Sequence, residues 1–383
     1  MRIVFVELLL IRVPFRRTFE HASAQRSHSE NVLIHCVAAS GAEGWGETIA
    51  RKYVTGENTT GVVEKIRGMK LGLWTREFVT ASDVTDFCSD AALDGSVARC
   101  AVEIALLDCL AREKGLPLAR FLSASWPELA SIQDKPPIKY SGPLDLGSGA
   151  KTLTNAIKIR LFGFSAVKLK LSGRLRDDVR NLRLARFALG SNIDLRVDAN
   201  ESWSQDYTSG IAAALRRARV SAVEQPFPRD RLDWAAEFSV RTGIPLIFDE
   251  SLCSEQDAFK IAALGLPSLF AVKLAKIGGF WPTLRVAAVA RGRGIPVQIG
   301  CQVGESAVLS AAGRHLASVC PELRYLEGSY DAFLLSSNVI DGNVSFGWGG
   351  RAPALDGPGL GIDVDNERVS KMVMSRFDLF GRA

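Results

Sequence analysis

The sequence predicts an α/β protein, in which a barrel of parallel strands and helices follows a smaller domain of antiparallel strands and helices. In the second part of the chain, short apolar runs alternate regularly with segments of helical pattern. A proline-rich connector at 135–137 precedes this alternation. A doubly wound open sheet is the alternative, but no glycine-rich dinucleotide fingerprint follows any of the predicted strands. The barrel is therefore the preferred fold.

The first 50 residues predict three antiparallel strands, at 3–13, 31–38 and 44–49. The polar segment 16–29 between the first two is uncommonly long for a hairpin loop, and a second polar segment follows at 51–56. Because long loops in compact domains are often functional, we expect both segments to lie over the mouth of the barrel and to become ordered on ligand binding.

A helical region follows from about residue 59 to residue 122. Its strongest helix is 97–112, which has an apolar stripe at helical spacing and stops before Gly115 and Pro117. Glu103 and Asp108 within it are expected to be surface or capping groups. Residues 1–132 are therefore assigned to the N-terminal domain.

Residues 133–339 are assigned to the barrel. The last segment, 340–383, is rich in glycine and proline and is expected to return to the first domain. The expected barrel strands lie near residues 138–141, 166–171, 194–198, 220–224, 245–249, 269–273, 296–300 and 324–328.

Composition indicates an ordinary globular protein: 383 residues, 47% of them hydrophobic, and a net charge of only +5. The basic residues are scattered, so we expect no nucleic-acid partner. No apolar run reaches the roughly 20 residues of a membrane span, and Glu7 interrupts the apolar opening, which is expected to be a strand rather than a signal peptide. Seven cysteines without metal-ligand spacing favour a reducing, cytoplasmic location.

The segment 166–171 reads Ala-Val-Lys-Leu-Lys-Leu, so Lys168 and Lys170 share one face of a predicted strand. An edge strand protected by lysines is the usual explanation of such a pattern. The runs downstream favour another. They end in Asp198, Glu224, Asp249 and Lys273. Counted from Lys170, the successive intervals between these residues are 28, 26, 25 and 24 residues. In a parallel barrel these strand ends meet at one mouth, which predicts an active site of carboxylates and lysines. Glu250 is expected on the opposite strand face.

These residues resemble the motifs of the enolase superfamily, and within it the muconate lactonizing enzyme (muconate cycloisomerase-like) subgroup. The likeness rests on Lys168-Leu-Lys170, on the acids with their neighbours (Asp198-Ala-Asn200, Glu224-Gln-Pro226, Asp249-Glu-Ser251) and on Gly300-Cys-Gln-Val-Gly-Glu305. It implies a modified (β/α)7β TIM-like barrel with an N-terminal α+β capping domain.

The resemblance implies that Asp198, Glu224 and Asp249 hold Mg²⁺, with Mn²⁺ as a substitute, and that Lys170 and Lys273 are the catalytic bases. The residue types suit that chemistry, since Mg²⁺ prefers oxygen ligands and a proton next to a carboxylate is lost only if the developing charge is stabilised. The like charge of Lys168 and partial burial are expected to lower the pKa of Lys170, as a general base requires.

Expected substrate-binding residues are Arg26, Tyr53, Gln302 and Glu327. Arg26 or Arg51 would pair with a distal carboxylate, and each is as readily a solvated loop residue. The eighth strand ends in Leu-Glu-Gly-Ser, which resembles the cycloisomerases and lacks the Asp-x-Asp of the dipeptide epimerases.

The sequence thus predicts an Mg²⁺-dependent isomerase, either a cycloisomerase or a racemase or epimerase, that acts on a small anionic carboxylate and forms a homo-oligomer. A syn-dehydratase of the o-succinylbenzoate synthase type is the alternative with the same first step. A non-catalytic binder on the same fold is a third reading, but a binder has no need of two opposed lysines beside three metal ligands.

Overall fold

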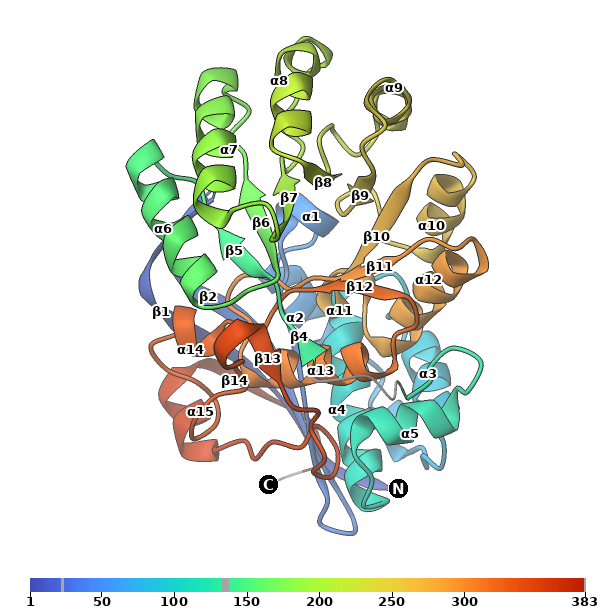
Figure 1. Cartoon of the computed structure of the whole chain (residues 1–383). Coiled ribbons are helices and arrows are strands. Elements are labelled where there is room, and N and C mark those ends of the chain that lie inside the picture. Colours follow the sequence, from blue (N-terminus) through green and yellow to red (C-terminus); the bar gives the residue numbers. More distant parts are fainter. Residues whose placement is uncertain (22–23, 133–137, 382–383) are drawn as a thin grey trace.

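The computed structural model describes residues 1–21, 24–132 and 138–381, which form a two-part α/β structure (Figure 1). One part is a four-stranded antiparallel sheet in the order β14-β1-β2-β3, with helices against it. The other is a curled parallel sheet of eight strands in sequence order, from β5 to β12. The predicted modified barrel with an N-terminal α+β domain is confirmed.

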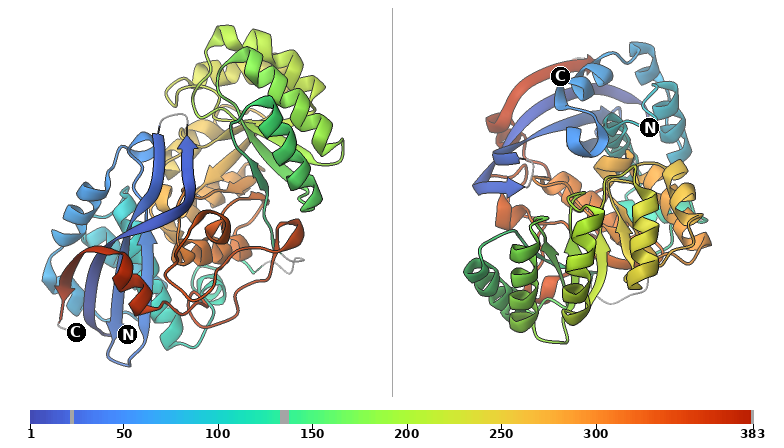
Figure 2. Two further views of the ribbon diagram at one scale, coloured as in Figure 1. Left: turned by 90° about the vertical axis from the view of Figure 1, so that its left-hand side faces the viewer. Right: turned by 90° about the horizontal axis from the view of Figure 1, so that it is seen from above.

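The antiparallel sheet consists of β1 (Ile3–His21), β2 (Ala24–Ala38), β3 (Glu43–Thr48) and β14 (Val373–Phe380). The polar segment expected to be a loop instead extends β1 and β2 into one long hairpin, so that expectation was wrong in its local structure. Cross-strand backbone bonds sustain a ladder without an apolar face, and this is why the polar composition concealed it. Figure 2 shows the hairpin rising beside the barrel. Residues 22–23 lie outside the described residues.

Helices of the N-terminal part are α1 (Lys52–Thr55), α2 (Thr59–Arg67), η1 (Leu71–Thr75), α3 (Ala81–Asp90), α4 (Val97–Glu113) and α5 (Leu118–Ser125). Ser96 caps the N-terminus of helix α4, and its side chain accepts a hydrogen bond from the Ala98 amide. The helix packs so closely on β3 that a Cβ at Gly46 would overlap the Ala101 carbonyl oxygen.

Glu103 and Asp108 of α4 were expected to be surface or capping groups; both are fully buried, so the surface placement was wrong. Glu103 accepts the Phe280 amide, and Asp108 accepts the amides of Trp45 at 3.0 Å and Leu360 at 2.7 Å. The two carboxylates therefore connect α4 to distant parts of the chain through backbone donors that only the fold brings near.

Strands and helices alternate through the barrel: β5 (Gly142–Leu144), α6 (Gly149–Leu161), β6 (Ala166–Lys170), α7 (Leu175–Leu189), β7 (Asp194–Asp198), α8 (Gln205–Arg217), β8 (Val220–Glu224), α9 (Leu232–Thr242), β9 (Leu246–Phe248), α10 (Glu255–Ala262), β10 (Ser268–Val272), α11 (Leu274–Ile277), α12 (Phe280–Gly292), β11 (Val297–Ile299), α13 (Ala307–Val319) and β12 (Leu323–Leu326). The Ser141 amide donates to the Leu326 carbonyl at 2.8 Å and links the first and last strand regions.

The first barrel strand is β5 rather than the expected 138–141. Residues Ile138–Lys139 form β4, which pairs with β13 (Arg351–Ala352) outside the barrel. After β12 the chain forms α14 (Asp331–Leu334), η2 (Trp348–Gly350) and α15 (Asn366–Met372). It then returns to the first sheet, where β14 pairs with β1 (Figure 2). Within the described ranges, no helix is both long and apolar enough to cross a bilayer.

Candidate active site

A cavity of about 280 Å³ opens at the carboxyl ends of the barrel strands. Parallel strands place their C-terminal residues at one mouth, so side chains from most of the strands face it. Helix α1 of the N-terminal part contributes Tyr53 and Val54 to the same cavity. Lys168, Lys170 and Lys273 all line it, together with Asp198 and Asp249.

Lys168 lies on β6 and its ammonium group is surrounded by three carboxylates. The Nζ atom is 3.5 Å from Asp198, 3.0 Å from Glu224 and 2.7 Å from Glu327. Burial by itself would lower the pKa of Lys168, but the charges of these carboxylates raise it well above its usual value. The Lys168 ammonium group therefore offsets part of the negative charge of these carboxylates.

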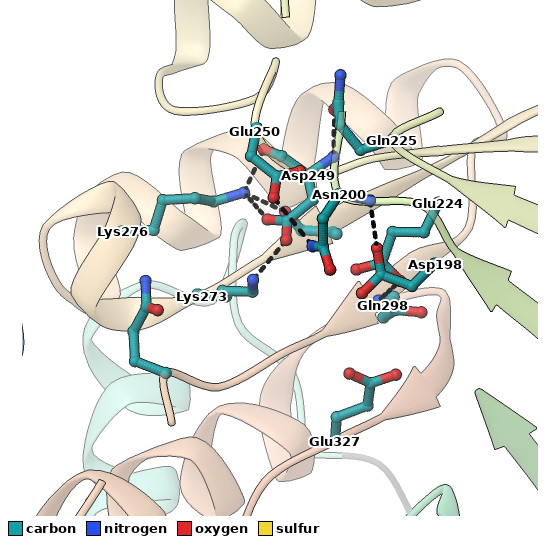
Figure 3. A network of polar contacts seen from close by, with 12 residues as sticks. Asp198, Asn200, Glu224, Gln225, Asp249, Glu250, Lys273, Lys276, Gln298 and Glu327 are labelled. Atoms are coloured by element: carbon teal, nitrogen blue, oxygen red, sulfur yellow. Dashed lines mark hydrogen bonds and ion pairs between the residues drawn. The ribbon is translucent and has the colours of Figure 1, made fainter. Parts of the chain in front are cut away.

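Asp249 follows β9 directly and is held by two lysines. Lys273, directly after β10, pairs with one carboxylate oxygen, and Lys276 of α11 donates to the other at 2.7 Å. Burial favours the neutral acid, but the two ammonium groups prevail and hold the pKa of Asp249 well below its usual range. The carboxylates in turn raise the pKa of Lys273 against the effect of burial. Figure 3 shows this arrangement.

Lys170 lies two residues after Lys168 on the same strand face, and its Nζ is 3.5 Å from Asn200 Oδ1. The Asn200 amide nitrogen donates to Glu250 Oε1 at 3.2 Å. Glu250 lines the cavity, so its expected place on the opposite face was wrong. Strand β9 ends at Phe248, and the alternation of a strand does not continue into the turn at Asp249.

The fit of these residues to a divalent cation depends on the carboxylates. Over the described ranges, no three acidic, histidine or cysteine side chains form a ready cluster, and lysine amines contact Asp198, Glu224 and Asp249. Two observations nevertheless support a cation. Glu250 Oε2 is buried without a hydrogen bond, and burial together with the charges of Asp249 and Asp198 raises the pKa of Glu250. The site thus gathers several oxygen donors, and one of them, Glu250 Oε2, has no hydrogen-bond partner among the described residues, which suits Mg²⁺.

Three of the four expected substrate-binding residues line the cavity, and the fourth does not. Tyr53, Gln302 and Glu327 line the cavity. Arg26 is not among the lining residues, and its guanidinium lies over the Tyr53 ring at 5.7 Å from the centroid. Arg51 is buried and donates to Ser29 Oγ at 3.0 Å and to the Val303 carbonyl, so it joins the two domains rather than facing the cavity.

Sequence reasoning missed four side chains around the site: Lys276, Gln298, Arg196 and Glu305. Gln298 donates to Glu224 at 2.9 Å, and the fully buried Arg196 lies 3.3 Å from Glu327 and 3.9 Å over the Tyr325 ring. Burial raises the pKa of Glu305 to about 8. Arg196 could have been predicted from the sequence to lie beside an acidic residue, since a charged residue inside a predicted buried strand needs a partner.

Comparison with known families matches both parts of the chain. Residues 152–369 match "Enolase C-terminal domain-like", and residues 5–123 match "Mandelate racemase / muconate lactonizing enzyme, N-terminal domain".

Three relatives illustrate the range of similar proteins. An L-Lys-D/L-Arg epimerase of Methylococcus capsulatus is 30% identical over 94% of this chain and 99% of its own. A dipeptide epimerase of Cytophaga hutchinsonii, in complex with Mg and D-Ala-L-Val, superposes with a TM-score of 0.88 at 25% identity, over 99% of this chain and all of that one. The muconate lactonizing enzyme of Pseudomonas fluorescens, in complex with muconolactone, gives 0.86 at 25% identity, over 97% and 99% of the two chains.

Proposed function

The chain belongs to the mandelate racemase and muconate lactonizing enzyme family of the enolase superfamily, and from this premise we propose that it is a racemase or epimerase. It is an isomerase whose reaction begins with removal of the α-proton of a carboxylate substrate. The finer assignment rests on one observation: Lys170 and Lys273 line the same cavity from two separate strands of the barrel. The first is at the end of β6 and the second follows β10, four strands further along the eight-stranded sheet.

The two lysines act on opposite faces of the same carbon. One amine takes the proton from the α-carbon and the other returns a proton to the opposite face, so the configuration inverts. Lys168 remains a cation between Asp198, Glu224 and Glu327, where it offsets their charge. Lys276 holds Asp249 through both its carboxylate and its carbonyl oxygen, at 2.7 Å each.

Asp198, Glu224 and Asp249 are the proposed Mg²⁺ ligands, with Mn²⁺ as an alternative metal. Bound there, the metal supplies a Lewis acid that stabilises the negative charge developing on the substrate carboxylate. Tyr53, Gln302 and Glu327 are the proposed substrate contacts, and the place of Arg26 gives it the role of supporting the Tyr53 ring. All seven cysteines are unpaired, which agrees with the proposed cytoplasmic location. We also propose a homo-oligomer.

A cycloisomerase is the second candidate, because Glu327 and the following Gly-Ser occupy the end of β12 and the carboxylate contacts Lys168. A syn-dehydratase would use one lysine as the base and keep the other charged.

Hydrogen exchange in D₂O tests the assignment. N-acyl amino acids and dipeptides of both configurations are incubated with enzyme and Mg²⁺, and the α-proton is followed by NMR. A racemase or epimerase exchanges both antipodes and interconverts them, whereas a dehydratase loses mass. Lys170→Ala and Lys273→Ala are each expected to lower turnover by about 10²–10⁴-fold, as for loss of a general acid or base. Near-normal turnover in both variants would refute the two-base mechanism.

A further inference from the structure

We infer that the distal end of the cavity accepts an apolar substituent of the substrate, aliphatic or aromatic, rather than a charged one. This inference rests on the proposed function, because it concerns the part of an α-proton-bearing carboxylate that lies away from the lysines. It is carried by the apolar part of the cavity lining, called here the apolar wall: Tyr53, Val54, Val303, Tyr330, Phe333 and Leu334.

The apolar wall is built from three separate parts of the fold. Helix α1 supplies two residues, the loop after β11 supplies Val303, and the segment from the end of β12 through α14 supplies three. Tyr330 presents its ring rather than its hydroxyl, because the hydroxyl donates to the Ser141 carbonyl at 3.0 Å. The wall thus offers mainly hydrocarbon surface to a ligand.

Behind the wall lies a cluster of aromatic rings. Phe333 contacts Phe346 with ring centroids 5.3 Å apart and Phe162 at 6.3 Å, and Tyr330 lies 5.8 Å from Phe346. Phe333 is nevertheless 53% exposed. An aromatic side chain held by its neighbours and open to a cavity gains free energy when a ligand covers it, at roughly 25 cal/mol per Å² of apolar surface.

Charged groups of the cavity lining are otherwise engaged. Among the described lining residues, the charges beyond those gathered at the strand ends around the lysines are Asp145, Glu305 and Asp331. Glu305 accepts a hydrogen bond from the Gln302 amide at 2.6 Å. Asp331 is buried and accepts hydrogen bonds from Asn338 at 2.8 Å, the Val344 amide at 2.9 Å and Ser345 Oγ at 2.6 Å, so it is satisfied within the protein. Asp145 is exposed and follows β5 rather than the wall. A charged distal group would lose hydration against the wall, and the acids nearest to it in sequence, Glu305 and Asp331, are already held by hydrogen bonds within the protein.

Three acids of similar length test the inference on the full-length enzyme with Mg²⁺. They share one N-acylated amino acid and differ only in the acyl group: 4-methylpentanoyl (apolar), succinyl (anionic) and 4-aminobutanoyl (cationic). Calorimetry measures binding, and α-proton exchange in D₂O measures reactivity. We expect the apolar acid to exceed both charged acids by at least about tenfold in affinity and in kcat/KM.

Two variants separate the wall from a general effect. Phe333→Ala is expected to lower kcat/KM for the apolar acid about tenfold and to change the charged acids less than about twofold. Phe259→Ala is the matched control, because Phe259 is 54% exposed on α10 and does not line the cavity. Leu334→Lys is expected to shift the preference toward the succinyl acid.

The outcomes distinguish this inference from the proposed function. Equal or tighter binding of a charged acid, or a uniform effect of Phe333→Ala on all three acids, would overturn the apolar wall as a specificity determinant. If the apolar acid binds most tightly but its α-proton does not exchange, the proposed reaction fails while the inference stands.

Discussion

Replacement of Gly300 by alanine is expected to displace Lys273, the proposed catalytic lysine after β10, without disturbing the fold. Gly300 follows β11 closely, and its φ lies outside the left-handed region, so alanine introduces no backbone strain. A Cβ at this position would lie 2.8 Å from Lys273 Cε and 3.2 Å from its Cγ. Since ordinary contact begins at 3.4 Å, Cε must move by at least 3.4 − 2.8 = 0.6 Å.

Gly300→Ala should affect catalysis more than stability. The end of a lysine side chain moves easily, so the fold is little disturbed, whereas the rate of proton transfer depends on the position of the amine. A misplacement of about 1 Å can cost roughly 10²-fold in rate, so we expect kcat to fall by roughly 10- to 100-fold with KM little changed. Exchange of the α-proton from the antipode served by Lys273 should fall more than exchange from the antipode served by Lys170.

The assay measures initial rates and D₂O exchange for each antipode, with thermal unfolding as the test of folding. Gly313→Ala in α13 is the matched control, because a Cβ there meets no atom within 4 Å. Wild-type rates for both antipodes in Gly300→Ala, with an unchanged melting temperature, would show that the position of Lys273 does not limit the reaction.

Three further predictions address metal binding, the domain contact and pH. Asp198→Asn should weaken Mg²⁺ binding at least tenfold by calorimetry, whereas the exposed cavity residue Asp145 changed to Asn should not; equal affinities would remove Asp198 from the metal site. Glu47 is buried and accepts hydrogen bonds from Asn31 at 2.5 Å, from the Ser306 amide at 3.0 Å and from the Leu309 amide at 2.9 Å. Glu47→Ala should therefore lower the free energy of unfolding in denaturant by about 2–5 kcal/mol, and Glu47→Gln should lower it clearly less. An unchanged free energy of unfolding in the alanine variant would contradict this account. Burial lowers the pKa of His315 to about 4, so between about pH 6.5 and 4 only the unfolded chain binds a proton at this histidine. The free energy of unfolding should therefore fall as pH falls through this range, by up to about 3 kcal/mol. A His315→Gln variant with the same pH dependence as the wild type would refute the role of His315 in this pH dependence.

The sequence by itself determined the barrel and the chemical side chains of the mouth. Regular alternation of strands and helices leaves few architectures, and a parallel barrel brings the ends of all strands to one side. Lys168, Lys170 and Lys273 could therefore be placed at one cavity from their spacing, and so could Asp198 and Asp249. These features depend on periodicity and strand order, which a single sequence carries.

Only the tertiary structure decided which groups meet across elements. Glu103 and Asp108 were expected to be surface or capping groups, and only the fold shows that amides distant in sequence bind them in the core. Glu250 faces the cavity because β9 ends before it. The apolar wall joins α1 to α14, which are nearly 280 residues apart in numbering, 331 − 55 = 276. Such contacts depend on how the domains dock and where strands end, and neither leaves a periodic trace in the sequence.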